Sequence, residues 1–101
     1  MGENPEQIDY IERATIHKMG NVRRAWVLAD EKKALPDGVM SVRALWELDC
    51  KAKKFRTLEL SMFAGSMGGG PVLESFSKPG DWNDIAPRTN GATIHKIVCA
   101  R

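Results

Sequence analysis

Residues 41–62 read SVRALWELDCKAKKFRTLELSM and contain the clearest alternation of apolar and polar side chains in the chain. In the first half of this stretch the apolar residues share one parity: Val42, Ala44, Trp46, Leu48 and Cys50. The other parity is polar except at Leu45, and this pattern predicts a strand with one buried face, because successive side chains of a strand point to opposite faces. After the charged segment 51–54, alternation resumes at Leu58, Leu60 and Met62. The whole stretch therefore predicts a β-hairpin with Cys50 near its tip.

The segments on either side of this hairpin predict further strands. Upstream, Met19-Gly20-Asn21 is a turn signal between two apolar runs, which favours a second hairpin. The run from Val22 to Ala29 is apolar on both parities, which is typical of a strand inside a sheet with both faces covered. Downstream, Val72 to Phe76 predicts one more short strand. These segments together indicate a mainly β domain.

The C-terminal segment, Thr89 to Arg101, follows a different pattern. Its large apolar side chains recur at helical spacing: Ile94, Ile97 and Val98. Thr89 or Asn90 could begin a helix as its N-cap. Gly91 and the β-branched residues lower the helix propensity of the segment. The sequence leaves a helix and a final strand as alternatives here.

The length of 101 residues indicates one domain, because two cores of half that size would bury too little surface to be stable. Residues 1–7 are polar and predict a disordered N-terminal tail, followed by a single domain over residues 8–101. Fifteen basic and 13 acidic residues give a net charge of +2, which does not indicate a nucleic-acid partner. The sequence contains no transmembrane segment, since no apolar run is long enough to cross a bilayer.

Cys50 and Cys99 are the only two cysteines, and neither lies in a CxxC or CxxH motif. In an oxidising compartment they would form a disulfide. Closing so long a loop would contribute about 4 kcal/mol in the chain-entropy model. We expect the disulfide; two buried free thiols in a cytosolic protein are the alternative.

The sequence predicts no catalytic, cofactor-binding or metal-binding site. A metal site needs three or four converging ligands, and we expect His17 and His95, which share a Thr-Ile-His-Lys context, to face solvent. Cys50 lies on the apolar parity of its strand, which favours burial over a reactive thiolate. The glycine-rich segment Gly65–Gly70 lacks the Lys-Ser/Thr ending of a phosphate-binding loop and precedes a strand. We interpret that segment as a hairpin connection.

The candidate ligand surface consists of basic side chains and one tryptophan. The basic residues lie on the two predicted hairpins and would form a patch if the hairpins lay side by side: Arg23, Arg24, Lys51, Lys53, Lys54 and Arg56. The simpler interpretation is that these charges keep strand edges and turns from aggregating. Trp26 and Trp46 lie in apolar strand patterns, which predict that both side chains belong to the core. Trp82 lies in a loop between prolines, and we expect a lid on the core, with a contact surface as the alternative.

An ordered set of short motifs runs through nearly all of residues 8–100. The first half of the set is Tyr10, Thr15-Ile16, Gly20, Val22, Ala25-Trp26-Val27, Ser41 and Leu48-Asp49-Cys50. The second half is Arg56, Leu58, Gly65–Gly70, Val72, Trp82, Ile85-Ala86-Pro87 and Val98-Cys99. Each motif is common by itself, but the ordered set that ends in the two cysteines resembles the surface-adhesin protein E family of exported Gram-negative bacterial proteins.

The resemblance implies an α+β, mainly β fold, in which a curved antiparallel sheet of about five or six strands carries a C-terminal helix tethered by the Cys50–Cys99 disulfide. It also implies a location in the periplasm or at the cell surface, so we expect that a signal peptide has been removed. Homodimers are a further expectation. The family includes an adhesin that binds host matrix proteins such as vitronectin and laminin.

We therefore expect a non-catalytic extracytoplasmic binding domain that uses no cofactor. Its ligand would be a protein, either a host matrix protein or an envelope protein, bound through a sheet face or a hairpin edge. The alternative hypothesis is a periplasmic structural or stress-related envelope protein with a bacterial partner.

Overall fold

The protein is described by a computed structural model over residues 7–100. Within that range the strands are β1 (Gln7–Met19), β2 (Val22–Glu31), β3 (Ser41–Asp49), β4 (Lys54–Phe63), β5 (Val72–Phe76) and β6 (Asn83–Asp84). All pairings are antiparallel, in the order β1-β2-β3-β4-β5, and β6 pairs with β4. A 3-10 turn (η1, Ser66–Gly68) lies between β4 and β5, and the helix α1 (Asn90–Val98) follows β6. The expected α+β, mainly β architecture is confirmed.

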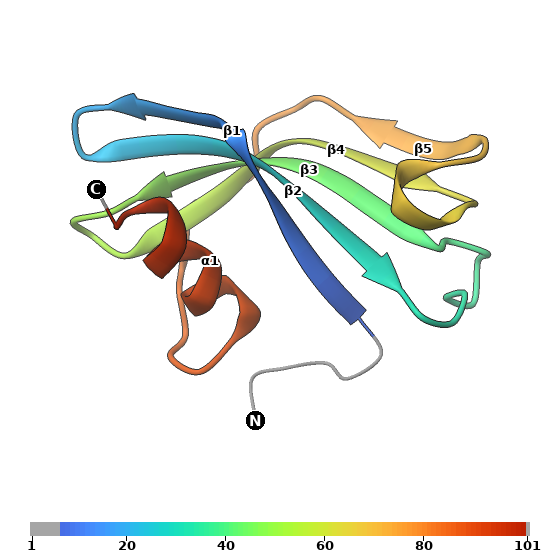
Figure 1. Ribbon diagram of the computed structural model, residues 1–101. Coiled ribbons are helices and arrows are strands. Elements are labelled where there is room, and N and C mark those ends of the chain that lie inside the picture. Colours follow the sequence, from blue (N-terminus) through green and yellow to red (C-terminus); the bar gives the residue numbers. More distant parts are fainter. Residues whose placement is uncertain (1–6, 101) are drawn as a thin grey trace.

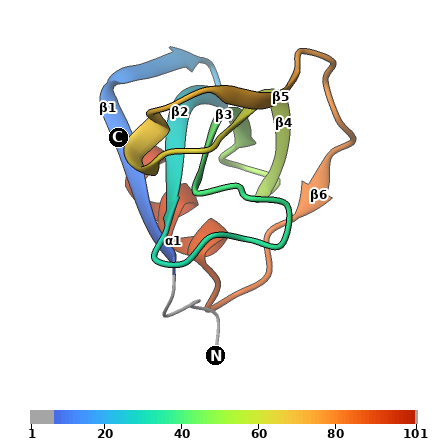
Figure 2. The same cartoon turned by 90° about the vertical axis from the view of Figure 1, so that its right-hand side faces the viewer.

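The sheet is arched, and α1 lies under one side of it (Figure 1). In the view turned by 90°, β1 and β6 lie on opposite sides of the molecule with α1 between them (Figure 2). We call the sheet surface that contacts α1 the inner face and the opposite surface the outer face. Of the residues predicted as a tail, Gln7 already belongs to β1; residues 1–6 lie outside the described range.

The core lies between the inner face and α1. Its buried members come from β2, β3 and the helix: Ala25, Val27, Leu48, Ile94 and Val98. Trp46 and Phe55 pack against this cluster, and their rings stack with centroids 4.6 Å apart. The apolar side chains predicted to share one face of β3 therefore lie on the inner face.

Both predicted hairpins are present. β1 and β2 pair across Gly20-Asn21, where Gly20 has φ +65°. A positive φ at the first of two turn residues is the geometry for which glycine is preferred in tight hairpins. β3 and β4 pair across a turn that begins at Cys50. Because β2 lies between β1 and β3 in the sheet, its predicted interior position is confirmed.

β4 departs from the predicted alternation at Leu58. Trp46 lies opposite Thr57, whereas the preceding residue Leu45 lies opposite Glu59, so Leu58 is an extra residue without a direct partner on β3. An extra residue of this kind is a β-bulge, which interrupts the ladder and changes the side-chain parity. The strict alternation predicted for this strand is therefore wrong, because residues before and after the bulge reach the inner face on different parities.

The C-terminal alternatives are resolved in favour of a helix. The hydroxyl of Thr89 accepts a hydrogen bond from the Ala92 backbone N–H at 3.1 Å, as an N-cap does. A helix of nine residues is not stable by itself in water. Burial of Ile94 and Val98 against the inner face therefore outweighs the low helix propensity around Gly91.

The end of α1 is fixed to the sheet at two points. Cys99, directly after the helix, forms the expected disulfide with Cys50, directly after β3. Beside it, the Arg23 guanidinium donates a hydrogen bond to the Val98 carbonyl at 3.0 Å. A cation is favourable at a helix C-terminus, where the backbone carbonyls carry partial negative charge.

Replacing both cysteines by serine (Cys50→Ser/Cys99→Ser) should lower the free energy of unfolding by about 2–5 kcal/mol, because the unfolded chain gains the entropy of an open loop. Urea denaturation followed by tryptophan fluorescence measures the change. Arg23→Gln, which removes the neighbouring hydrogen bond and leaves the disulfide, should cost about 1 kcal/mol. A double serine variant as stable as the parent would show that the helix is held by packing alone.

Candidate functional site

The outer face carries a row of charged side chains across the three interior strands. Arg24, Glu47 and Arg56 lie directly opposite one another on β2, β3 and β4. They point away from α1, because Glu47 is adjacent to Leu48, whose side chain is in the core. The row is therefore a direct consequence of strand register.

Glu47 is the centre of this row. Its side chain is only 6% exposed, and its two carboxylate oxygens contact different arginines: Arg24 at 3.0 Å and Arg56 at 2.7 Å. Arg24 is 43% exposed and its ion pair is screened by solvent, whereas Arg56 is 29% exposed. The Arg56 contact is therefore the stronger of the two.

The protonation of Glu47 reflects two opposing effects. Burial raises the pKa of its carboxyl group, and the hydrogen bonds from Arg56 and Arg24 lower it by more, so that the net pKa lies below the ordinary value of 4.5. The carboxylate is thus charged at neutral pH, and it holds both guanidinium groups in place.

A second ion pair continues the charged row toward β1. Arg43 and Glu12 form two hydrogen bonds, at 2.8 and 3.0 Å, and the Arg43 guanidinium lies 4.0 Å from the centre of the Trp26 ring. The hydrogen bond from Arg43 lowers the pKa of Glu12, although burial opposes this effect. Trp26 therefore lies under a cation on the outer face, and the prediction that it belongs to the core is wrong.

Trp82 lies at the other end of the row. The Arg56 guanidinium is 4.7 Å from the centre of its ring, and 38% of its surface is exposed. The ring is positioned by the adjacent β6, whose residues Asn83 and Asp84 pair with the start of β4. The preferred prediction of a lid on the core is wrong, because the loop carries Trp82 to the outer-face side of Arg56.

The structure brings only some of the predicted ligand-surface residues together. Arg24, Arg56 and Trp82 share the outer face, whereas Arg23 points to the inner face and contacts the end of α1. The two neighbouring arginines are separated because consecutive side chains of a strand alternate between faces. Arg23 consequently has a structural role.

The predicted lysines lie at the tip of the β3–β4 hairpin. Lys51 and Lys53 are exposed in the turn, which Asp49 holds by accepting hydrogen bonds from two backbone N–H groups at 3.1 and 2.9 Å. Lys54 begins β4 and lies 3.6 Å from the exposed carboxylate of Asp84. Lys54 has the same strand parity as Arg56 and therefore continues the outer-face charges toward the hairpin tip, where Lys51 and Lys53 add two exposed cations.

A sulfur- and nitrogen-rich cluster on the inner side was missed by the sequence prediction. The side-chain ligand atoms of Cys50, His95 and Cys99 lie within 4.8 Å of one another. Nε2 of His95 is buried, so the expectation that this histidine faces solvent is wrong. The spacing of His95 and Cys99, four residues apart in a helix-like segment, is the signal that could have found it.

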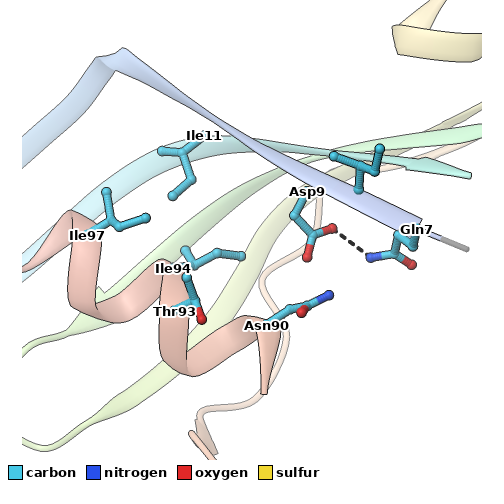
Figure 3. Close-up of a pocket in the computed structure, with 8 residues that line it drawn as sticks. Gln7, Asp9, Ile11, Asn90, Thr93, Ile94 and Ile97 are labelled. Atoms are coloured by element: carbon cyan, nitrogen blue, oxygen red, sulfur yellow. Dashed lines mark hydrogen bonds between the residues drawn. The ribbon is translucent and has the colours of Figure 1, made fainter. Parts of the chain in front are cut away.

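An open apolar groove lies between the first half of β1 and α1 (Figure 3). Its volume is about 260 Å³, and Ile11, Ile94 and Ile97 form its apolar walls. Gln7 and Asp9 lie at its edge and are hydrogen-bonded to each other at 2.6 Å. The groove shows that α1 covers the inner face incompletely at the end remote from the disulfide.

The comparisons with known proteins agree with the observed fold. The family model for surface-adhesin protein E matches residues 1–100, and no curated protein matches the sequence. Crystal form II of Haemophilus influenzae protein E is similar with a TM-score of 0.75 and 17% identity, over 97% of this chain and 90% of that one. Protein E from non-typeable Haemophilus influenzae has a TM-score of 0.68 and 17% identity, over 97% and 78% of the two chains. At these identities the structural likeness concerns the fold alone.

Glu47→Gln should lower the free energy of unfolding at pH 7 by about 1.5–3 kcal/mol, because it removes the charge that both arginines contact. The folded-state pKa of Glu47 lies below 4.5. Its contribution is therefore complete above that pH and is lost as the pH falls through the folded-state pKa. Urea denaturation between pH 3 and pH 7 should show the parent and the variant converging in acid.

Glu74→Gln is the matched control, because Glu74 is exposed on β5. It should follow the pH profile of the parent. A constant difference between Glu47→Gln and the parent across the whole range would contradict the assigned role of the Glu47 charge.

Proposed function

We propose that this chain, which belongs to the surface-adhesin protein E family, is a non-catalytic extracytoplasmic domain that binds a protein ligand through its outer face. The family match over residues 1–100 carries the proposal. The ligand is a host matrix protein or a bacterial envelope protein, and the domain needs neither a cofactor nor a nucleic acid.

The outer face supports this role because its charged groups are fixed before a ligand arrives. Arg56 is held between the Glu47 carboxylate and the Trp82 ring. A tryptophan and an arginine held in one orientation lose little freedom on binding, and these two residue types often dominate protein interfaces. Lys51 and Lys53 add positive charge at the edge of this surface. The arrangement suits an acidic segment of a protein ligand.

The disulfide supports an extracytoplasmic location, because such bonds persist in oxidising compartments. Within residues 7–100, no helix is long and apolar enough to span a bilayer. The periplasm or the cell surface is therefore the proposed location, reached after removal of a signal peptide.

The proposed homodimer would use the edge strand β5. Its residues are exposed along its whole length, including Val72 at 55% and Phe76 at 51%. In the described sheet β5 pairs with β4 on one side only, so its other side can pair with β5 of a second copy around a two-fold axis. Five residues bury little surface, and the dimer is expected to be weak.

Charge reversal at the hairpin tip, Lys51→Glu/Lys53→Glu, should weaken solid-phase binding to an acidic matrix-protein ligand about tenfold. The panel includes vitronectin and laminin. Lys32→Glu/Lys96→Glu makes the same change in net charge away from the outer face, on the β2–β3 loop and on α1, and should bind like the parent.

Trp82→Ala is a second test of the same surface that leaves the net charge unchanged. It should also weaken binding to the matrix protein about tenfold. Leu35→Ala, which removes a large apolar side chain of similar exposure that lies on the inner side with Ala29 and Val42, is its control. A parent domain that binds no matrix protein would contradict the adhesin hypothesis. A defined partner recovered from periplasmic extract would then favour the envelope-structural alternative.

Leu73→Lys should abolish self-association by placing a charge on β5, which analytical ultracentrifugation across a concentration series would detect. Met19→Lys changes an exposed apolar residue at the end of β1 and should associate like the parent. A parent that remains monomeric at the highest concentration would contradict the proposed dimer.

A further inference from the structure

We propose that Cys50, His95 and Cys99 bind Zn²⁺ when the disulfide between the two cysteines is reduced. The inference rests on the position of the three ligand atoms, which lie within 4.8 Å of one another. It does not depend on the ligand-binding role of the outer face, because the three residues lie where the end of α1 meets the end of β3.

The helix places two of the three residues side by side, and the β3–β4 turn brings the third to them. His95 and Cys99 are four residues apart, and such residues lie on the same side of a helix, one turn apart. Cys50 reaches them from the first position of the β3–β4 turn, which is tied to the sheet by a hydrogen bond from the Cys50 N–H to the Asn21 carbonyl at 2.8 Å. The sheet therefore holds Cys50, and the packing of Ile94 and Val98 together with the Arg23 hydrogen bond to the Val98 carbonyl keeps α1 beside it when the disulfide is reduced.

The distances suit a tetrahedral ion after small side-chain movements. A Zn–S distance of about 2.3 Å places two tetrahedral thiolates about 3.8 Å apart. The two sulfur atoms are bonded to each other in the disulfide, and the two Cα atoms are 5.7 Å apart. Rotation of the two cysteine side chains provides the extra separation, and the imidazole needs to approach the sulfurs by about 1 Å.

His95 provides an independent observation. Its Nε2 atom is buried, and it has no hydrogen-bond partner within the described residues. Buried polar atoms are normally paired, so an unpaired one calls for an explanation. A metal ion bound by the His95 imidazole and the two sulfur atoms would give this buried ring a polar partner.

The donor set selects the metal. Two thiolates and one imidazole are the ligands of Cys₂His zinc sites, in which a water molecule completes a four-coordinate shell. Carboxylate oxygens, which magnesium and calcium prefer, do not belong to the cluster. The expected ligand is therefore Zn²⁺, and Co²⁺ can replace it as a spectroscopic probe.

The chemistry requires a reductant, which is a dithiol. The dithiol transfers two electrons and two protons to the Cys50–Cys99 bond, giving two thiols, and it becomes a disulfide itself. Zn²⁺ then displaces the two thiol protons to form two Zn–S bonds, and it accepts a lone pair from an imidazole nitrogen of His95 to form one Zn–N bond. Zinc therefore stabilises the dithiol form against reoxidation.

Co²⁺ titration of the reduced, reductant-free protein under anaerobic conditions tests the proposal. The reduced parent should develop the thiolate-to-cobalt charge-transfer band and the visible bands of tetrahedral cobalt, and the oxidised parent should not. His95→Ala should bind Co²⁺ at least about tenfold more weakly, since even indirect disturbance of a metal ligand has an effect of that size. His17→Ala, which changes the histidine in the matching Thr-Ile-His-Lys context, should bind like the parent.

Melting temperatures of the reduced proteins, measured with and without Zn²⁺, provide a second readout that remains informative if reduction destabilises the fold. Zn²⁺ should raise the melting temperature of the reduced parent and of His17→Ala, because an ion that binds the folded form stabilises it. It should not raise that of His95→Ala. Equal Co²⁺ affinity and spectra for the reduced parent and His95→Ala would overturn the site, as would an absence of tetrahedral bands together with an unchanged melting temperature.

Discussion

The bond between Cys50 and Cys99 is the constraint on which the rest of the structure depends. α1 has nine residues and buries only Ile94 and Val98 fully, too little apolar surface to hold a helix firmly against a sheet. The disulfide keeps the helix at the inner face even when this packing fluctuates. The groove beside β1 shows the consequence, because α1 lies less closely on the sheet at the end that the bond does not hold.

Because the helix lies on the inner face only, the inner face is apolar and the outer face carries charged side chains. β2 and β3 supply alternate side chains to the core, so the side chains between them are free to be charged. The buried Glu47 carboxylate is tolerated on the outer face because two arginines contact it. A buried carboxylate with one partner removed would be costly. The same contacts that stabilise the face also fix the Arg56 guanidinium against Trp82.

The features that could be predicted from the sequence are those set by local pattern. The alternation around Leu48 identified β3 and its inner parity, and the turn at Gly20 identified the first hairpin. The bulge at Leu58 could not be predicted, because it depends on how β4 pairs with β3. The placement of Trp82 likewise depends on β6 pairing with a distant strand. The separation of Arg23 from Arg24 was predictable, since strand parity requires it.

β3 shows why the core, the charged face and the cysteine cluster cannot be treated separately. Within four consecutive residues it places Glu47 on the outer face, Leu48 in the core, Asp49 at the turn and Cys50 in the disulfide. A shift of one residue in its register would reverse the first two positions and move the sulfur away from Cys99. The disulfide and the ion pairs of Glu47 therefore support the same register from opposite faces.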